Sequence, residues 1–249
     1  MKNHLKSIPA PKSWSIGRKD NKFMPKPRPS GHKREFGLPL TLLLKQNLGL
    51  AATSSEVKKI LHNNEVLVDG IRREEARFLV GLFDILQLPK LKKSYCMVFD
   101  NQGRLSLVEI KNEKASEKMC QVTGKTALVG GKIQYHLHDG RNLISDKKMN
   151  LGDSLLLSLP KPEIKSVFEL KTGCWVFLTK GKHRGECGQL KSLNGEEATY
   201  LVDGNEVSTL KKYLFVLSEK PSWVSSEDNK KADIKEDKKS SKKVSGESQ

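Results

Sequence analysis

The sequence predicts a mixed α+β protein made of several small domains rather than one large core. Hydrophobic residues form only 36% of the 249 residues, which supports small cores. Helical spacing of apolar residues is clearest between residues 38 and 62, whereas residues 95–217 hold short apolar runs separated by glycine turns. Proline and charge gather at the ends of the chain. We therefore expect five parts, in this order: a basic extended N-terminal arm (1–37), a small α/β module (38–94), a small central β domain (95–169), a further small β unit (170–218) and a disordered tail (219–249).

The formal net charge of +16 indicates what kind of partner the chain binds, and does not indicate its fold. Nucleic acid is the usual partner of so basic a chain, and a membrane surface is the next candidate. No run of about 18 apolar residues is present, so no membrane span is expected. The first residues lack the apolar stretch of a secretory signal. The cysteines (Cys96, Cys120, Cys174 and Cys187) lie far apart without C-x-x-C spacing, which favours reduced thiols in a cytosolic protein over structural zinc or disulfides.

The two ends of the chain differ in charge. Residues 1–35 hold ten Lys and Arg against Asp20 and Glu35, together with five prolines, which disfavour helices and central strands. We expect this arm to become ordered on RNA phosphates, with Trp14 and Phe23 as apolar anchors; a disordered tail is the alternative. From residue 225 onward the sequence contains seven lysines, six acidic residues and almost no apolar residues, which predicts a solvated, disordered tail.

The α/β module begins with a predicted buried helix from Leu40 to Leu48 that ends at Gly49. Thr53 and Glu56 then form a capping box before a second helix, and residues 65–72 read as strand, Asp-Gly turn and strand. Two short helices followed by such a hairpin resemble the small RNA-binding module named after bacterial ribosomal protein four. The resemblance implies RNA contacts by the following residues: Ser54, Lys58, Lys59, His62, Arg72 and Arg73.

The central domain is expected to be a small barrel or sandwich. Residues 95–99 and 105–110 flank a glycine-containing hairpin turn, and residues 111–119 form a short polar stretch compatible with a helix. Further turns are predicted at TGKT, at GGK and at HLHDGRN, before the apolar strand near residues 154–159.

Two features of this domain mimic enzyme signatures. Gly124-Lys125-Thr126 looks like the end of a phosphate-binding loop, but Met119 occupies the position where that loop needs its first glycine. His136 and His138 would share a face of a strand, but no third ligand lies near them in sequence, and Asp139-Gly140 is a favoured turn pair. We therefore predict a plain strand and turn here rather than a nucleotide or metal site.

The last unit combines a strand at residues 173–178, a basic loop with repeated glycines and a closing strand at residues 214–217. This pattern resembles the KOW motif of small SH3-like barrels, although a plain charged hairpin would look similar. The resemblance implies phosphate contacts by Lys180, Lys182, His183 and Arg184 at the loop tip.

A series of short motifs spans residues 4–218. In chain order they are HLK, APKSW, PKPRPSGH, LPL, VDGIRR, GLFDIL, GKT, GGK, LHDGRN, NLGDSLLLSLP and ELKTG. This series resembles small-subunit ribosomal protein four of the archaeal/eukaryotic type, and its archaeal form in particular. The chain departs from the family pattern at Leu79, at Gln46-Asn47 and at Glu186-Cys187. The resemblance implies a structural constituent of the ribosome in the cytoplasm, with ribosomal RNA and neighbouring small-subunit proteins as partners. It implies no enzyme activity, cofactor, small-molecule substrate, membrane contact or homo-oligomer.

The predicted site is thus an RNA-binding surface without catalytic or metal-binding residues. Besides the module and loop residues named above, it includes arm residues and three spaced cations of the central domain: Lys6, Lys12, Trp14, Arg18, Lys26, Arg28, Lys33, Arg34, Lys125, Lys132 and Arg141. Two alternatives stay open, a KOW-containing transcription or translation factor and an RNA-modifying enzyme with the same module. The enzyme is disfavoured because two small β units leave no room for a catalytic domain.

Overall fold

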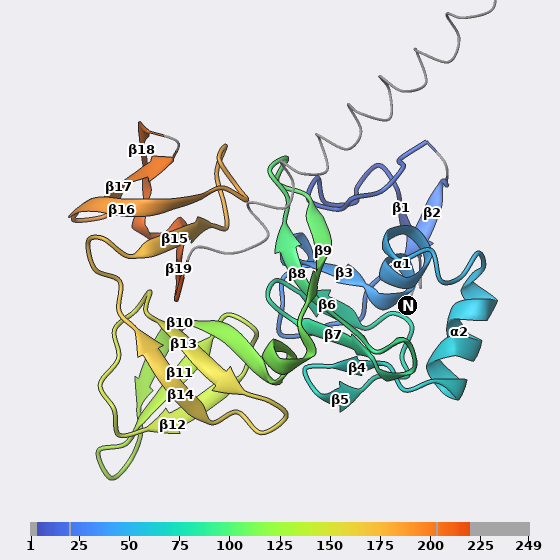
Figure 1. The fold of residues 1–249 in the computed structure, drawn as a ribbon, viewed down its shortest axis with the longest axis horizontal. Coiled ribbons are helices and arrows are strands. Elements are labelled where there is room, and N and C mark those ends of the chain that lie inside the picture. Colours follow the sequence, from blue (N-terminus) through green and yellow to red (C-terminus); the bar gives the residue numbers. More distant parts are fainter. Residues whose placement is uncertain (1–3, 20, 203, 220–249) are drawn as a thin grey trace, which may run out of the picture.

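Strands make up most of the regular secondary structure in the described chain, and they are arranged in three five-stranded antiparallel sheets and two short two-stranded pairs (Figure 1). The structure is a computed structural model that describes residues 4–19, 21–202 and 204–219. Helices are few and short, so the predicted mixed α+β class is corrected to a mostly β class. The predicted disordered tail lies outside the described residues, apart from Glu219.

The first sheet and the helices form one unit. Its helical segments are α1 (Leu40–Leu42), η2 (Leu43–Asn47), α2 (Ser54–Asn63) and the 3-10 turns η1 (Arg34–Phe36), η3 (Pro89–Leu91) and η4 (Asn112–Ser116). Its sheet has the order β5 (Ile71–Arg72), β4 (Leu67–Val68), β7 (Ile85–Leu88), β8 (Lys93–Phe99) and β9 (Leu105–Ile110). A separate pair joins β3 (Gly37–Pro39) to β6 (Leu79–Gly81).

Local signals predicted the helices correctly. The Glu56 amide donates to the Thr53 hydroxyl at 3.2 Å, and Glu56 accepts in return from the Thr53 amide, so the capping box starts α2 as expected. The predicted helix from Leu40 is present, but its second half is a π-helical turn, and Gly49 follows with a φ of +63°. Leu40, Leu43 and Leu44 are fully buried, which explains the excess of leucine around this helix.

The predicted domain boundary at residue 95 falls inside this sheet. The hairpin of β8 and β9 forms as expected, but β8 pairs with β7, placing Cys96 opposite Ile85. Met97, Val98 and Phe99 are buried in the same core as the leucines of the helices. The β8–β9 hairpin therefore adds apolar side chains to the core of the first sheet. The first unit therefore extends to about residue 110.

The central sheet has the order β12 (Asn142–Ser145), β11 (Ile133–Leu137), β10 (Glu117–Ala127), β13 (Ser154–Ser158) and β14 (Ile164–Phe168). Tyr135 and Leu155 lie in its small core. The predicted TGKT turn is wrong, because Gly124 to Thr126 continue β10 in register with β11. The predicted turns at GGK and Asp139-Gly140 are confirmed by positive φ angles at their glycines.

The C-terminal sheet has the order β18 (Asn205–Leu210), β17 (Glu197–Val202), β16 (Cys187–Asn194), β15 (Trp175–Leu178) and β19 (Leu214–Leu217), with the 3-10 turn η5 (Lys211–Tyr213) before the last strand. Val176 and Tyr200 are fully buried in its core. The predicted closing strand is confirmed. In Figure 1 this unit lies above the central sheet and beside the β8–β9 hairpin.

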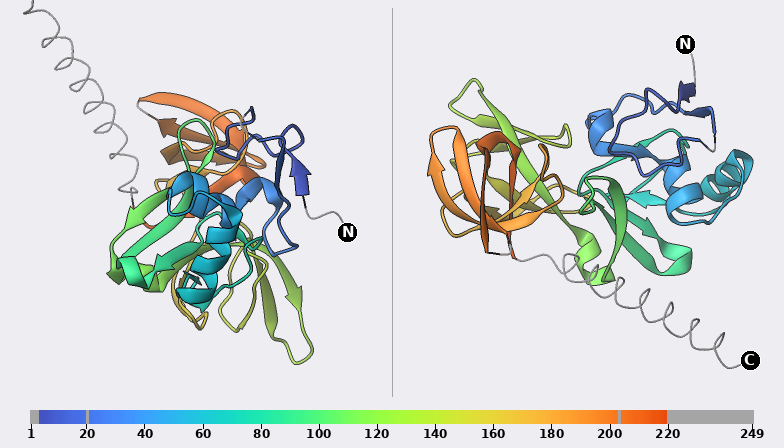
Figure 2. Two further views of the ribbon diagram at one scale, coloured as in Figure 1. Left: turned by 90° about the vertical axis from the view of Figure 1, so that its right-hand side faces the viewer. Right: turned by 90° about the horizontal axis from the view of Figure 1, so that it is seen from above.

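The N-terminal arm is folded onto the first unit, with a short antiparallel pair of β1 (His4–Lys6) and β2 (Phe23–Pro25) (Figure 2). Trp14 is only 2% exposed, and its indole N–H donates to the Arg34 carbonyl at 2.9 Å. The Leu105 amide donates to the Ser13 carbonyl at 2.7 Å. The arm is therefore anchored by contacts with the protein itself.

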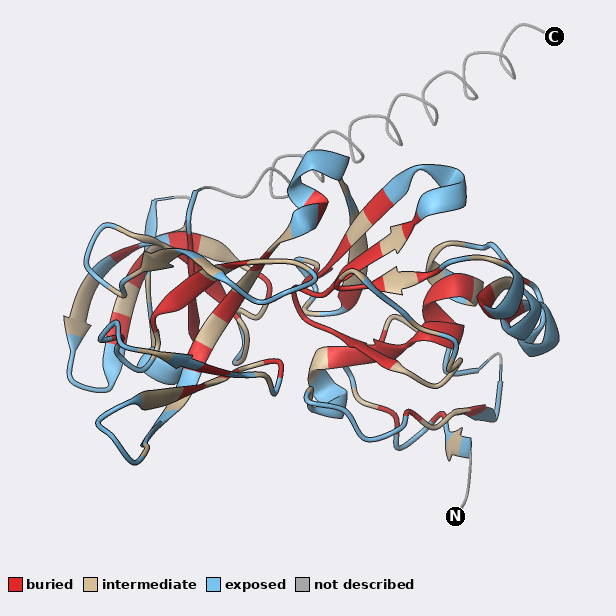
Figure 3. Ribbon diagram, turned by 90° about the horizontal axis from the view of Figure 1, so that it is seen from below, coloured by how far each residue is buried: buried red, intermediate tan, exposed pale blue. Residues whose placement is uncertain are grey.

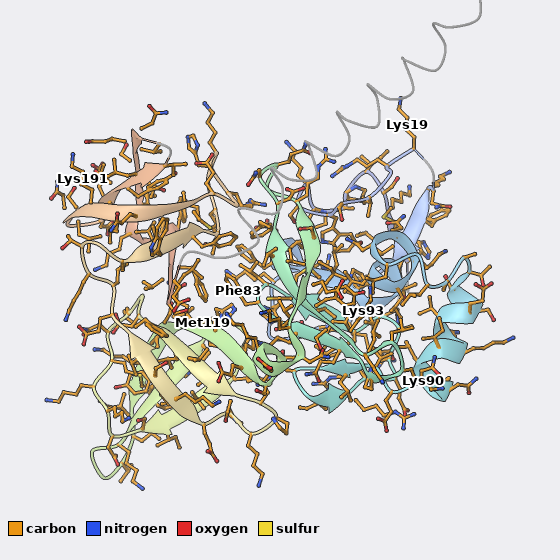
Figure 4. The ribbon with its side chains drawn as sticks, in the orientation of Figure 1. Lys19, Phe83, Lys90, Lys93, Met119 and Lys191 are labelled. Carbon is orange, nitrogen blue, oxygen red and sulfur yellow. The ribbon has the colours of Figure 1, made fainter. Side chains whose placement is uncertain are left out.

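The first unit, the central sheet and the C-terminal sheet meet at an aromatic cluster in the middle of the molecule. Phe83 lies within 5.5 Å of Phe177 and 4.4 Å of Phe215, measured between ring centroids, and His138 packs edge-on against Phe215. Figure 4 places Phe83 and Met119 in this central region, and Figure 3 shows buried segments converging there. This shared core fixes the arm, the first unit, the central sheet and the C-terminal sheet as one framework.

Candidate nucleic-acid interface

One face of α2 carries a row of exposed polar and basic side chains. Ser54, Lys58 and His62 are four residues apart, so they lie on one side of the helix, and all three are exposed. The Arg72 guanidinium donates to the His62 carbonyl at 3.1 Å, which brings β5 beside the end of the helix. Lys59 is exposed next to this row.

Sequence reasoning missed Lys90. Its ammonium donates to the Asn63 carbonyl at 3.3 Å, so it extends the same basic surface across the C-terminal end of α2 (Figure 4). No local pattern could have shown this, because the two residues are 27 positions apart. We refer to the following residues as the α2 surface: Ser54, Lys58, Lys59, His62, Arg72 and Lys90.

Arg73, predicted in the same set, points into the protein instead. Its guanidinium carbon lies 4.4 Å from the centre of the Phe78 ring, and the residue is half-buried. A cation over an aromatic face is stabilised by the ring's electron-rich surface. Arg73 therefore packs against the first unit through Phe78.

The arm cations are divided between the surface and the protein. Lys6, Lys12 and Lys33 are exposed, as are Arg18, Arg28 and Arg34, whereas Lys26 is half-buried. Arg18 donates to the carbonyls of Ile8, Ala10 and Pro11, and Arg28 pairs with Glu75 at 3.1 Å. These two arginines hold the shape of the arm. Trp14 is buried, as expected of an apolar anchor of the arm.

The C-terminal loop is less free than its sequence suggested. The Arg184 guanidinium lies 5.2 Å from the centre of the Phe99 ring, and His183 contacts the Glu186 carboxylate at 2.9 Å. A Cβ on Gly185 would overlap the Asp100 carbonyl, so the loop is packed tightly against the β8–β9 hairpin. Lys182 is the exposed member of the predicted loop set, and Lys180 is half-buried.

A cavity of about 380 Å³ opens where the arm and the three units meet. Three lysines from separate segments, Lys33, Lys180 and Lys212, line this junction cavity, and its described lining contains no acidic side chain. The Lys180 ammonium lies 5.4 Å from the centre of the Phe36 ring, which also lines the cavity. Sequence reasoning missed Lys212, because its place beside the arm depends on the packing of distant segments.

Beneath the surface lies a buried charge cluster. The Lys118 ammonium, with 0% exposure, contacts Asp69 at 2.7 Å, Asp84 at 2.5 Å and Asp139 at 3.0 Å. Asp69 and Asp139 belong to the two predicted Asp-Gly turns, so turns from different units converge on one lysine. His32 of the arm contacts Asp84 at 3.0 Å. The cluster therefore joins the arm, the first unit and the central sheet.

Charge and burial compete in this cluster. Burial acts to raise the pKa of Asp84, but His32 and Lys118 outweigh it and hold the pKa well below its usual value. Burial, with the charge of Asp84 added, raises the pKa of Asp69. Burial opposes the charge of Lys118, yet the surrounding acids, Asp84 foremost, raise its pKa well above the usual value. The cluster thus keeps a charged lysine inside the protein.

Arg141, predicted to bind RNA, belongs to this cluster. Its guanidinium donates to Asp69 at 2.6 Å and lies 3.4 Å from Asp139, and its side chain is 23% exposed. The charge of Arg141 is therefore neutralised within the protein. By contrast, Lys125 and Lys132 are exposed on the β10–β11 hairpin.

The two histidines of the central domain use their ring nitrogens separately. His136 bonds to Thr126 and Asn142, whereas His138 accepts from the Gln121 amide and contacts the Leu82 carbonyl. Within the described residues, no group of three or more His, Cys, Asp or Glu is placed to hold a metal ion. No helix in that part of the chain is long and apolar enough to cross a membrane.

Comparisons with known proteins decide the family. Residues 91–164 match the family model described as ribosomal family S4e, and residues 1–35 match the RS4NT domain. The small ribosomal subunit protein eS4 of Methanocella arvoryzae is 39% identical over 221 residues, covering 86% of this chain and 94% of the relative. The chain belongs to the ribosomal S4e family. The predicted family resemblance, including its archaeal character, is confirmed.

Further members of the S4e family agree with this placement. The eS4 protein of Methanosphaera stadtmanae is 38% identical over 224 residues, covering 88% of this chain and 93% of its own. The crystal structure of the 30S ribosomal protein S4e from Thermoplasma acidophilum superimposes with a TM-score of 0.64 at 30% identity, covering 73% of this chain and 94% of that one. These relatives are named as ribosomal proteins and not as enzymes.

Proposed function

We propose that this chain is a structural constituent of the small ribosomal subunit that binds ribosomal RNA through its basic surfaces. The observation that carries the proposal is the match over nearly the full length of relatives that are named as small ribosomal subunit proteins. Its partners are then ribosomal RNA and neighbouring subunit proteins, and its place is the ribosome of the cytoplasm. No catalytic step is part of this function.

Two units of the chain have RNA-binding counterparts. The helices and first sheet correspond to the module named after bacterial ribosomal protein four, extended by the β8–β9 hairpin. The C-terminal sheet corresponds to an SH3-like KOW barrel. The α2 surface supports the first assignment, because a helix with cations on one side fits a row of phosphates.

The mechanism is neutralisation of crowded phosphates by a rigid framework. Double-helical RNA offers side chains little base readout, so binding depends on phosphates, the 2′-hydroxyls and shape. We assign the contacts to exposed cations on the α2 surface, the arm, the β10–β11 hairpin and the C-terminal loop. Besides the α2 surface these are Lys6, Lys12, Lys33, Arg34, Lys125, Lys132 and Lys182.

The test is the salt dependence of binding to purified small-subunit ribosomal RNA. The affinity of the full chain is measured by filter binding between about 50 and 200 mM salt, where phosphate contacts cause a steep loss. The double variant Lys58→Ala/Lys59→Ala removes two phosphate contacts, so the slope of log affinity against log salt falls by about 2.

The matched control is Lys165→Ala/Lys191→Ala. These lysines are also solvent-exposed, but they pair with Glu117 and Glu206 within the central and C-terminal sheets. The control keeps the wild-type slope. Binding of the wild type that does not change with salt, or equal slopes for both double variants, would reject this mechanism.

A further inference from the structure

His136 is held flat across the central sheet by its neighbours on both sides. It lies on β11, where it pairs with Gly124 of β10 and Asn142 of β12. Its Nδ1 lies 2.8 Å from Asn142 Oδ1, and its Nε2 lies 2.9 Å from Thr126 Oγ1. Because an amide oxygen only accepts, Nδ1 donates to Asn142, and Nε2 of the neutral ring accepts from the Thr126 hydroxyl.

These two bonds leave only the ring face for a ligand. Bonds that reach the strands on either side fix the imidazole across the sheet, so one face of the ring is turned away from the backbone. Both nitrogens are occupied, which removes His136 as a metal ligand or a free hydrogen-bonding group. The residue is only half-buried, and both of its side-chain hydrogen bonds lie at exposed positions.

Gly124 keeps the space beside the ring open. A Cβ at this position would lie 3.2 Å from His136 Cδ2, which is closer than an ordinary van der Waals contact, so a side chain would press on the imidazole. The φ of Gly124 is not positive, and its strand conformation does not require glycine. A side chain at position 124 would therefore crowd the His136 ring, although it would not strain the backbone.

The backbone of His136 is linked to the wall of the junction cavity through Thr123. Thr123, which precedes Gly124, lines that cavity, and its hydroxyl donates to the His136 carbonyl at 3.0 Å. The cavity that Thr123 lines also holds Lys33, Lys180 and Lys212, and exposed Lys125 and Lys132 lie on the β10–β11 hairpin to which His136 belongs. A nucleotide stacked on His136 has cations available for its neighbouring phosphates.

We propose that the face of His136 is a stacking site for an unpaired base of the bound RNA, whose backbone continues along the lysines of the junction cavity. Flat aromatic rings on a sheet are common platforms for unpaired bases, and stacking tolerates any base because each has a π face. The inference rests on the proposed function and adds one base contact to a surface otherwise made of phosphate contacts.

The experiment compares full-length His136→Ala and His136→Phe for binding to purified small-subunit ribosomal RNA at fixed salt. Loss of a stacked base weakens binding roughly 5- to 100-fold in His136→Ala. Phenylalanine retains a flat ring without the nitrogens, so His136→Phe binds close to the wild type. The control Ile144→Ala removes a side chain on β12 that is 61% exposed, and it leaves affinity unchanged.

The possible outcomes separate this inference from the proposed function. A wild type that fails to bind the RNA rejects the proposed function, whereas normal binding by His136→Ala rejects only the stacking site. Equal weakening of both His136 variants also overturns stacking, because it shows that the nitrogens matter rather than the ring. Ultraviolet crosslinking of the wild type, which needs no variant to fold, is expected to place a nucleotide on residues 133–142. Adducts confined to other segments overturn the proposal.

Discussion

The sharpest prediction concerns acidification and His138, which lies in the shared core of the three units. Its Nδ1 accepts from the Gln121 amide at 3.2 Å, which requires a neutral ring nitrogen. Burial, followed by the positive charge of Lys118 and the presence of His32, lowers its pKa from 6.5 to about 4, although Asp139 acts in the opposite direction. Protonation of this ring therefore opposes folding.

The size and sign of the effect follow from that pKa. A histidine whose pKa is lower in the folded state contributes its stability above pH 6.5 and loses it as the pH falls to about 4. At about 1.4 kcal/mol per pH unit, the loss amounts to about 3 kcal/mol. Asp84 and Asp139 have lowered pKa values, so their contributions disappear only below pH 3.8. Asp69, whose pKa is raised, opposes the loss at the acid end of this window.

The assay is urea denaturation of the wild type and His138→Gln between pH 7 and pH 4. Glutamine can accept from the Gln121 amide and donate to the Leu82 carbonyl, but it cannot become charged. The wild type should lose about 3 kcal/mol of unfolding free energy that the variant keeps. Identical pH dependence of the two proteins in this window would refute the argument.

Three further predictions test the framework by urea denaturation at pH 7. Lys118→Met leaves three buried carboxylates without their shared lysine, so it should lower the free energy of unfolding by about 3–5 kcal/mol. Lys165→Met breaks only an exposed pair with Glu117 and should lower it by less than about 1 kcal/mol. Similar losses in the two variants would contradict the burial argument. Thr53→Ala removes the α2 cap and should cost about 1 kcal/mol, with Ser55→Ala as a control close to zero; faster amide exchange confined to residues 54–63 would locate the effect. Gly185→Ala and Gly181→Ala both place alanine at positive φ, but only the alanine at position 185 overlaps a backbone carbonyl. Gly185→Ala should therefore be less stable than Gly181→Ala by about 1–3 kcal/mol. Equal losses would contradict the tight packing of the C-terminal loop against the β8–β9 hairpin.

Local signals in the sequence predicted many elements correctly. The capping box at Thr53, the turn at Asp69-Gly70 and the final strand depend on residues that are close in the chain. The exposed cations of α2 were predicted for the same reason, because helical spacing fixes which side chains share a face. These elements needed no information about the rest of the protein.

Features that depend on pairing between distant segments could not be predicted. Lys118 lies in a polar stretch of sequence, yet strand β10 carries it to three aspartates between 21 and 49 residues away. Strand β8 pairs with β7 rather than with the central sheet, so the predicted boundary at residue 95 lies within the first sheet. Arg141 and Arg184 looked like free cations, but Asp69 contacts the first and the Phe99 ring contacts the second, and both partners lie in the first unit. Lys90 and Lys212 reach the basic surfaces only through the fold.

The central claim is that the chain is a permanent part of the small ribosomal subunit. Quantitative mass spectrometry across a sucrose gradient of native extract, with a parallel moderate-salt wash, tests it most directly. We predict near-stoichiometric amounts in the small-subunit peak before and after the wash, because many phosphate contacts and a rigid framework hold the chain in place. Substoichiometric amounts, or loss into the light fractions under mild salt, would contradict the claim and indicate a factor that binds only transiently.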